Sequence, residues 1–381
     1  MLITILALAS DGSLHVYRKS PYLIFGRDDS SMVVLWQLYR TQESIFQWGT
    51  DTTYSLGTIV SREYNDLHQH KVKLTGLIPG RIYHYRVITD GVVKKGTFRA
   101  KVPSDDTTLT FYVYGDTRTY PLYHDSVAAA IVRDFMQNPS NQTFIISTGD
   151  LITDGGLEES WDEEFFNPDY PNIQNMLAHL PYMSATGNHE GRGFLFRLFF
   201  PYEMYVPWQL FYSFDAGPAH FVVLDQYVYY LPGSFQYQWL EEDLSRTTKP
   251  WKFIVLHEPG WSAGPHSDEE AVKRYIQPLA RKMGVKVILA GHNHNYSRAV
   301  VDGIHHITAG GGGAPLYDPD TTRPNLVKVD KSHHFVRVSI NGRKIKVTAI
   351  RADGSIIEEF TDSLPSKPAP KRIHREPMMV K

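Results

Sequence analysis

The sequence predicts a chain of two domains, an all-β sandwich followed by a layered α/β domain. Between residues 22 and 99, short β-branched and aromatic segments such as SMVVLWQLYR and IYHYRVITD are separated by Gly, Pro, Asp or Asn. This pattern, which has no helical period, is typical of a small β-sandwich. From Thr107 onward, strand-like segments such as TLTFYVYGD alternate with segments of helical periodicity such as SVAAAIVRDFMQ. Such alternation favours a layered α/β fold.

The boundaries follow from changes in composition. We expect the sandwich at residues 20–103 and the α/β domain at residues 107–362, joined by a polar linker that contains a proline. Residues 363–381 are rich in Pro and Lys and are predicted to be disordered. Residues 1–19 begin with the short apolar segment MLITILALAS, which is either the remnant of a secretory leader or an N-terminal strand. The first alternative predicts a secreted or periplasmic protein.

Composition excludes several classes of protein. The chain has 381 residues, of which 42% are hydrophobic and 13% aromatic, so it can build a core and is not a disordered protein. A formal net charge of −2 argues against a nucleic-acid binder with a large basic surface. No stretch approaches the ~20 apolar residues of a membrane span. Because the chain has no cysteine, thiolate nucleophiles, zinc–thiolate sites and iron–sulfur clusters are excluded.

Polar side chains follow five of the predicted strands at the point where each strand ends. They are Asp116 after FYVYG, Asp150 after FIISTG, Asn188 and His189 after YMSATG, His257 after FIVL, and His292 and His294 after VILAG. In open α/β sheets, ligands bind just beyond the carboxyl ends of the strands, so we expect these side chains to converge. A single Gly-Asp turn is usually structural, and the prediction depends on five occurrences in one domain.

The residue types in this cluster indicate a metal site. Carboxylates, an amide and neutral imidazoles without sulfur suit Zn, Fe or Mn. The set exceeds what one tetrahedral ion needs, but it would serve two ions ~3.5–4 Å apart that share one carboxylate. Such a pair generates hydroxide at neutral pH and screens the charge of a phosphoryl transition state. The sequence therefore predicts a binuclear site for phosphoester hydrolysis.

The same motifs resemble a known family. In order, GD, GD, GNHE, H and GHNH resemble the calcineurin-like metallophosphoesterase superfamily. The all-β module in front, with GHNHNYSR and GGGGAPLY, is similar to the purple-acid-phosphatase-like branch. The resemblance covers roughly residues 22–360. It implies a fibronectin-III-like sandwich followed by a four-layer α/β/β/α catalytic domain.

The resemblance also implies roles for individual residues. The implied ligands are Asp150 as the bridge, Asp116 and His294 at the first ion, and Asn188, His257 and His292 at the second. His189 would stand near the leaving-group oxygen and stabilise the transition state or protonate that oxygen. His266 matches a substrate-side histidine of the plant enzymes, or it is an exposed loop residue.

Two positions depart from the family pattern at the first ion. Arg118 stands where the superfamily often has a histidine, and Thr153 stands where purple acid phosphatases have a tyrosine. The first ion therefore lacks one expected ligand, and no tyrosinate–iron colour is expected. His124 either supplies the missing ligand or packs and caps the following helix. Arg118 either binds the substrate phosphate in a bidentate contact or pairs with a carboxylate such as Glu158.

The function that these observations favour is a metal-dependent phosphatase. A metal-bound hydroxide would attack phosphorus in line, and His189 would assist the departing alcohol. One alternative is a phosphodiesterase that acts on nucleotide or glycerophospho-type diesters. The other is a weakly active protein with one metal ion whose β module has a binding role. In each case the partner is a small phosphoester and no nucleic acid is expected, while the oligomeric state is not decided by the sequence.

Overall fold

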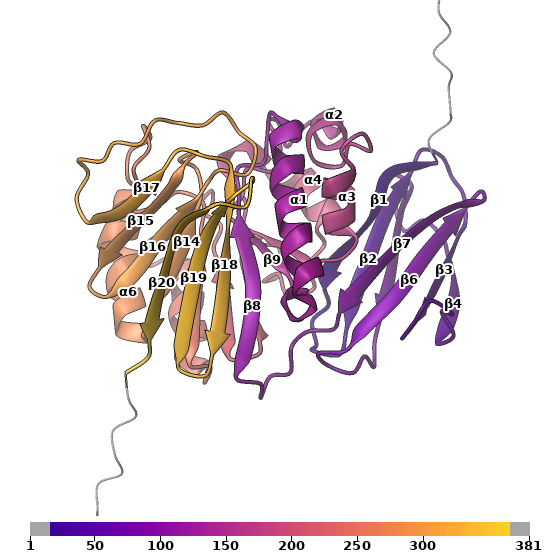
Figure 1. Cartoon of the computed structure of the whole chain (residues 1–381), viewed down its shortest axis with the longest axis horizontal. Helices are drawn as coiled ribbons and strands as arrows, with labels where there is room; N and C mark the ends of the chain where they lie inside the picture. The colour runs from indigo at the N-terminus through magenta and orange to yellow at the C-terminus, as the bar shows by residue number, and fades with distance from the viewer. Residues whose placement is uncertain (1–15, 366–381) are drawn as a thin grey trace, which may run out of the picture.

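The computed structural model describes residues 16–365, which form a β-sandwich packed against a larger α/β domain (Figure 1). The segment MLITILALAS and most of the predicted tail lie outside these residues. The first strand, β1, begins at Tyr17 and the last, β20, ends at Ser363, so residues 17–19 belong to the sandwich. None of the described helices combines the length and the hydropathy that a membrane crossing needs.

The sandwich consists of a three-stranded and a four-stranded antiparallel sheet. The first sheet contains, in spatial order, β1 (Tyr17–Phe25), β2 (Met32–Leu38) and β5 (Gln69–Leu74), and the second contains β4 (Gly57–Ser61), β3 (Ser44–Gly49), β6 (Ile82–Thr89) and β7 (Val92–Arg99). Alternate residues of β6 are buried, as expected for a strand with one face on the core. Trp36 is buried between the sheets, and its ring stacks on Phe46 and His70.

The α/β domain contains two mixed sheets that pack face to face (Figure 1). The first has the order β10 (Tyr182–Ser184), β9 (Ile145–Ser147), β8 (Thr108–Tyr114), β18 (His334–Asn341), β19 (Lys344–Arg351), β20 (Ile356–Ser363). The second has the order β11 (Tyr212–Ala216), β12 (Ala219–Val223), β13 (Trp251–Val255), β14 (Val287–Ala290), β16 (Ile304–Ala309), β15 (Tyr296–Val301), β17 (Leu326–Asp330). Phe111 of the first sheet packs edge-on against Phe221 and Phe253 of the second. The strands that carry the predicted ligands, β8–β10 and β13–β14, run parallel within each sheet.

Helices cover the outer faces of both sheets and complete four layers. They are α1 (Pro121–Gln137), α2 (Glu158–Ser160), α3 (Pro171–Leu177), α4 (Phe194–Phe199), α5 (Phe235–Arg246) and α6 (Gln277–Met283), with the π-helical turns Trp161–Phe165 and Val272–Ile276 and the 3₁₀ turns Pro139–Asn141 and Asn188–Glu190. Helices α1 and α3 pack together on the first sheet, and α5 and α6 bury apolar side chains against the second. His220 of β12 lies 2.7 Å from Asp215 of β11 and 2.8 Å from Asp243 of α5, and the second contact ties the helix to the sheet. The predicted α/β/β/α architecture is confirmed.

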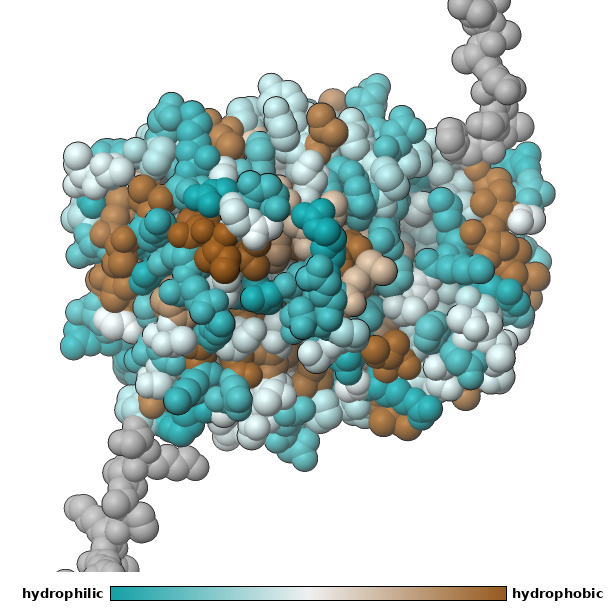
Figure 2. Space-filling model, in the orientation of Figure 1, coloured by the Kyte–Doolittle hydropathy of each residue, from teal (hydrophilic) through white to brown (hydrophobic). Residues whose placement is uncertain are grey.

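The two domains share a continuous core and a set of ion pairs. The edge strand β10 and helix α3 both contact β1 of the sandwich. Lys19 of β1 is fully buried, and its Nζ lies 2.5 Å from an Asp162 oxygen. Arg18 pairs with Glu158 at 2.9 Å. The sandwich therefore supports the helices beside the site. Its β3–β4 edge exposes apolar side chains, and Figure 2 shows a brown patch on this right-hand side, besides other brown patches over the α/β domain.

Candidate metal centre

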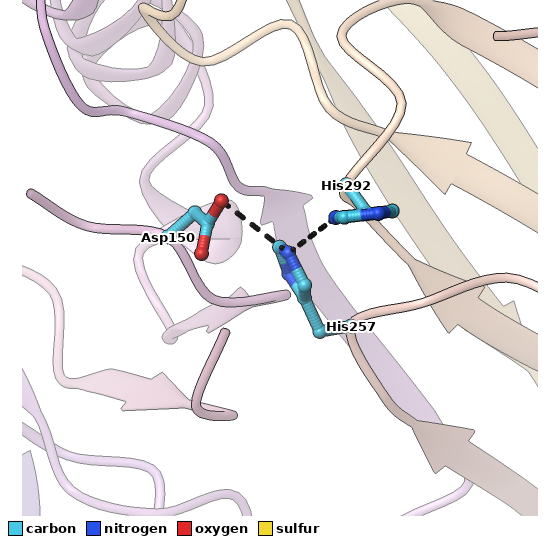
Figure 3. Close-up of side chains that lie close together, drawn as sticks. All are labelled: Asp150, His257 and His292. Atoms are coloured by element: carbon cyan, nitrogen blue, oxygen red, sulfur yellow. Dashed lines mark hydrogen bonds and ion pairs between the residues drawn. The ribbon is translucent and has the colours of Figure 1, made fainter. Parts of the chain in front are cut away.

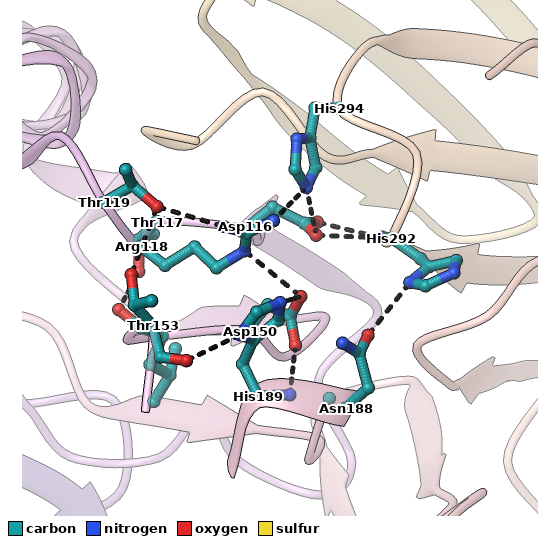
Figure 4. A network of polar contacts seen from close by, with 12 residues as sticks. Asp116, Thr117, Arg118, Thr119, Asp150, Thr153, Asn188, His189, His292 and His294 are labelled. Atoms are coloured by element: carbon teal, nitrogen blue, oxygen red, sulfur yellow. Dashed lines mark hydrogen bonds and ion pairs between the residues drawn. The ribbon is translucent and has the colours of Figure 1, made fainter. Parts of the chain in front are cut away.

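The structure brings six of the seven candidate ligands together at the carboxyl edge of the two sheets; Figure 4 labels five of them, and Figure 3 shows the sixth, His257, beside Asp150 and His292. Among the described residues, two overlapping groups could hold a metal ion: Asp116, Asp150 and His294, and Asp150, His257 and His292. Asp150 belongs to both groups. A carboxylate shared by both groups is in a position to contact two ions, and the bridging role that the resemblance implies for Asp150 stays a prediction.

The local backbone explains how strand ends deliver these side chains. Asp116, Asp150 and His292 adopt left-handed conformations with φ of 57°, 56° and 66°, which are costly for residues other than glycine. Each follows a glycine that turns the chain sharply at the end of its strand. A Cβ on Gly291 would overlap Asp116 Oδ2, and one on Gly187 would overlap Asp150 Oδ1. Glycine at these positions lets the loops approach each other closely.

The second group offers three ligand atoms at short range, one each from Asp150, His257 and His292 (Figure 3). His257 Nε2 lies 3.4 Å from Asp150 Oδ2, 3.2 Å from His292 Nδ1 and 3.2 Å from the side-chain oxygen of Asn188. His257 Nδ1 lies 2.7 Å from the Thr148 carbonyl oxygen, so it carries the ring proton and leaves Nε2 as a lone pair in the neutral form. The side-chain oxygen of Asn188 adds a fourth ligand atom to the three of the second group.

The electrostatics of this group fit a cation. Burial opposes protonation of His257, but Asp150 raises its pKa to about 10. Burial likewise opposes ionisation of Asp150, yet His257 and hydrogen bonds hold its pKa below the usual range. Burial, with the charge of His257, lowers the pKa of His292 to about 3. A carboxylate held ionised beside imidazole nitrogens is the donor set that a metal ion prefers, and metal binding would displace the proton from His257 Nε2.

The first group has a different environment. His294 Nε2 lies 3.6 Å from Asp116 Oδ1, and His294 Nδ1 lies 2.7 Å from the Pro315 carbonyl oxygen, which leaves Nε2 free to coordinate. Asp116 is fully buried, and burial raises its pKa well above the usual range. The His292 backbone N–H donates to Asp116. Tyr317 stacks on the His294 ring at 4.2 Å.

Arg118 lies inside this first group. Its Nε is 3.6 Å from Asp150 Oδ2, and its Nη2 is 3.4 Å from His294 Nε2. Glu158, the carboxylate named as one alternative partner of Arg118, is not that partner, because it pairs with Arg18 of the sandwich. The carboxylate that faces Arg118 is the bridging Asp150.

His124 is not brought to the site. It lies on the buried face of α1, where its Nε2 is 3.0 Å from the Tyr114 hydroxyl and its ring packs against Phe165. Burial lowers its pKa to about 3. Of the two alternatives for His124, the structure shows the packing role, and the first group gains no ligand from this helix. Thr153 also supplies no ligand atom to the first group, because its hydroxyl donates to Glu164.

The two remaining predicted residues lie at the rim. The His189 backbone N–H donates to Asp150 Oδ1 at 3.0 Å, and its Nδ1 lies 2.6 Å from the Thr153 carbonyl oxygen. This arrangement leaves His189 Nε2 beside the carboxylate, 3.9 Å from Oδ2. His266 packs on the ligand His292, with 4.2 Å between ring centroids. Both positions are compatible with the predicted substrate-side roles, which remain predictions.

Three residues of the site were not predicted from the sequence. Glu190 is buried and accepts the backbone N–H groups of Asp150, Leu151 and Gly187. Burial and the charge of Asp150 raise its pKa to about 7. Its bond from the Gly187 N–H is one half of a capping box around the turn that carries Asn188, but glycine has no side chain for the other half, so the sequence carries no complete capping signal. The other two, Glu164 and Tyr317, lie far in sequence from the residues they contact, and no local pattern reveals them.

Comparison with known proteins agrees with this geometry. The family model "Calcineurin-like phosphoesterase" matches residues 109–296, and the model "Purple acid Phosphatase, N-terminal domain" matches residues 19–101. Purple acid phosphatase 21 of Arabidopsis thaliana is 28% identical over 276 residues, which cover 66% of this chain and 59% of the plant protein. Human acid phosphatase type 7 is 26% identical over 429 residues, which cover 94% of each chain.

A solved structure shows the same fold. Purple acid phosphatase PPD1 from yellow lupin seeds superposes with a TM-score of 0.72 at 21% identity, over 90% of this chain and 74% of the lupin chain. The chain spans about half to three fifths of the length of the plant relatives that match it most strongly. The fold and the set of candidate metal ligands are those typical of the metallophosphoesterase class. More narrowly, the chain belongs to the calcineurin-like phosphoesterases and carries the N-terminal domain of the purple acid phosphatases.

Proposed function

We propose that the protein is a metal-dependent phosphatase that hydrolyses small phosphate monoesters. The observation that carries the proposal is the convergence of six ligands from five strand ends around the single carboxylate of Asp150. The relatives are named purple acid phosphatase and acid phosphatase, which supports the same activity.

The cofactor in this proposal is a pair of ions drawn from Zn, Fe and Mn. Carboxylate, amide and imidazole donors without any sulfur suit these metals. When bound, such a pair lowers the pKa of water and screens the charge that develops on a phosphoryl group. Because position 153 is a threonine, we expect no tyrosinate–iron colour.

The protein's own side chains bind the substrate and move a proton. His189, held by its backbone N–H and its Nδ1, presents Nε2 beside Asp150. In its cationic form it would hold a proton at Nε2 and give it to the departing alkoxide. The Arg118 guanidinium, 15% exposed, would contact the phosphoryl oxygens. His266, against His292, would face the substrate from the opposite loop.

The experiment compares chromogenic monoester and diester substrates with the metal-reconstituted full chain. We expect turnover of the monoester to exceed that of the diester, and Asp150→Asn to lose both metal and turnover. Asp154→Asn is the matched control, since this exposed carboxylate lies four residues away and contacts only the Gly156 backbone N–H. A higher rate on the diester would replace the phosphatase with a phosphodiesterase. An Asp150→Asn variant that retained full activity would refute both.

A further inference from the structure

The two metal-binding groups differ in the charges that face them. Around the second group, Asn188, His257 and His292 are neutral donors in the metal-bound state, and the shared Asp150 supplies the one carboxylate. Around the first group, two carboxylates and one imidazole already face a guanidinium, that of Arg118. A guanidinium stays protonated in proteins and cannot coordinate a cation.

Arg118 competes with a metal ion at one particular atom. Its Nη2 lies 3.4 Å from His294 Nε2, which is the nitrogen that this ring leaves free to coordinate. An N–H directed at that lone pair and an ion bound to it exclude each other. The positive charge also lies 3.6 Å from Asp150 Oδ2, the shared ligand, so it repels a cation placed beside it.

The surrounding turn holds Arg118 in this position. Its Nη1 lies 3.0 Å from the Thr119 hydroxyl, and the Thr119 backbone N–H donates to Glu164 at 2.6 Å. Glu164 also accepts the backbone N–H and the hydroxyl of Thr153. The side chain is 15% exposed, so solvent screens its charge only partly. Thr153, in place of a larger ligand residue, thus helps to fix the arginine.

We propose that Arg118 makes the two metal sites unequal, so that the chain binds one ion firmly at Asp150, Asn188, His257 and His292 and a second only weakly. The weak site is the group of Asp116 and His294. The inference rests on the proposed metal-dependent function, because it assigns different affinities to the two sites which that function uses. When only the tight site holds an ion, the Arg118 guanidinium supplies the positive charge beside Asp116 and His294.

Metal titration of the chelator-treated full chain tests this proposal without any substrate. With Mn²⁺ as the probe, we expect wild-type protein to retain one ion per chain after gel filtration. The second ion should need free Mn²⁺ on the order of 100-fold higher. Electron paramagnetic resonance should show an isolated Mn²⁺ spectrum at low loading and a coupled pair only at high loading.

Charge-matched variants separate the role of Arg118 from packing. Arg118→Lys keeps the charge and should keep unequal sites, whereas Arg118→Gln removes it and should bring the two affinities within about tenfold. If Arg118→Gln does not fold, Arg118→Met serves the same purpose. Adding Asp116→Asn to the neutral variant should remove the gained ion. Two equally tight ions in wild type, or identical titrations for the Lys and Gln variants, would overturn the inference.

The outcome is distinguishable from failure of the proposed function. Turnover of a monoester by a protein with two equal ions would refute only the inference about Arg118. Unequal sites together with no turnover of any phosphoester at saturating metal would refute only the phosphatase.

Discussion

Replacing Glu190 tests how the ligand loops are held. This carboxylate is buried beneath the metal centre and touches neither solvent nor the predicted substrate side. One oxygen accepts the N–H groups of Asp150, at 3.0 Å, and of Gly187, and the other accepts that of Leu151 at 2.7 Å. The side chain therefore joins the loop that carries Asp150 to the loop that carries Asn188.

The size of the effect follows from counting donors. Glu190→Gln keeps one side-chain oxygen, which can still accept two of the three backbone N–H groups. Its NH₂ group then faces the third N–H, so that donor has no acceptor. One unsatisfied buried donor costs about 1–3 kcal/mol. Glu190→Ala removes all three acceptor contacts and should reduce the free energy of unfolding by about 3–6 kcal/mol.

Urea unfolding of the metal-free protein, followed by tryptophan fluorescence, measures these differences. The matched control is Glu159→Ala, which removes an exposed carboxylate of the neighbouring helix α2 and should change stability by less than about 0.5 kcal/mol. The Ala variant should be clearly less stable than the Gln variant. If both variants matched Glu159→Ala, the three hydrogen bonds would contribute nothing and our account of the loops would be incorrect.

Further predictions concern charge, close packing and the domain interface. Burial opposes protonation of His220, but its two carboxylate partners raise the pKa to about 9. The folded pKa is thus above the unfolded value of 6.5. The protonated His220 therefore contributes up to about 3 kcal/mol to the free energy of unfolding, fully below pH 6.5, and this contribution is lost as the pH rises through 9. His220→Gln should remove that dependence, and unfolding at pH 6 and pH 10 measures it; an unchanged pH profile would contradict the assignment. Gly291→Ala should lower metal affinity at least about tenfold, because the added Cβ would overlap Asp116 Oδ2. Calorimetry with Mn²⁺ measures this affinity, and unchanged binding would contradict the prediction. Lys19→Met removes one of the two cations that pair with Asp162, since Arg18 Nε lies 2.6 Å from the same carboxylate, and should destabilise the folded chain by about 1–3 kcal/mol, whereas a neutral or stabilising effect in urea unfolding would show that the pair is dispensable.

The ligands could be predicted from the sequence because their signal is local. Asp116, Asp150, Asn188 and His292 each follow a buried strand and a glycine, as in FIISTGD for Asp150, whereas His257 follows its strand directly. Parallel strands then bring distant segments to one edge without further information. The order of strands and helices was readable for the same reason, since each element has its own period.

The alternatives that the sequence left open concern contacts that only the tertiary structure decides. His124 lies eight residues from Asp116, but the orientation of α1 directs its ring to Tyr114 in the core. Glu158 is close in sequence to Asp150, yet it pairs with Arg18 of the other domain. Charge and spacing along the chain could not reveal either partner. The start of β1 at Tyr17 was likewise hidden by the apolar residues that precede it.

Anomalous diffraction from crystals soaked in Mn²⁺ tests the central claim most directly. We predict a strong peak bounded by Asp150, Asn188, His257 and His292, with a weaker peak beside Asp116 and His294. A rim without any peak, or metal bound only elsewhere on the chain, would contradict the assignment of this edge as the metal centre.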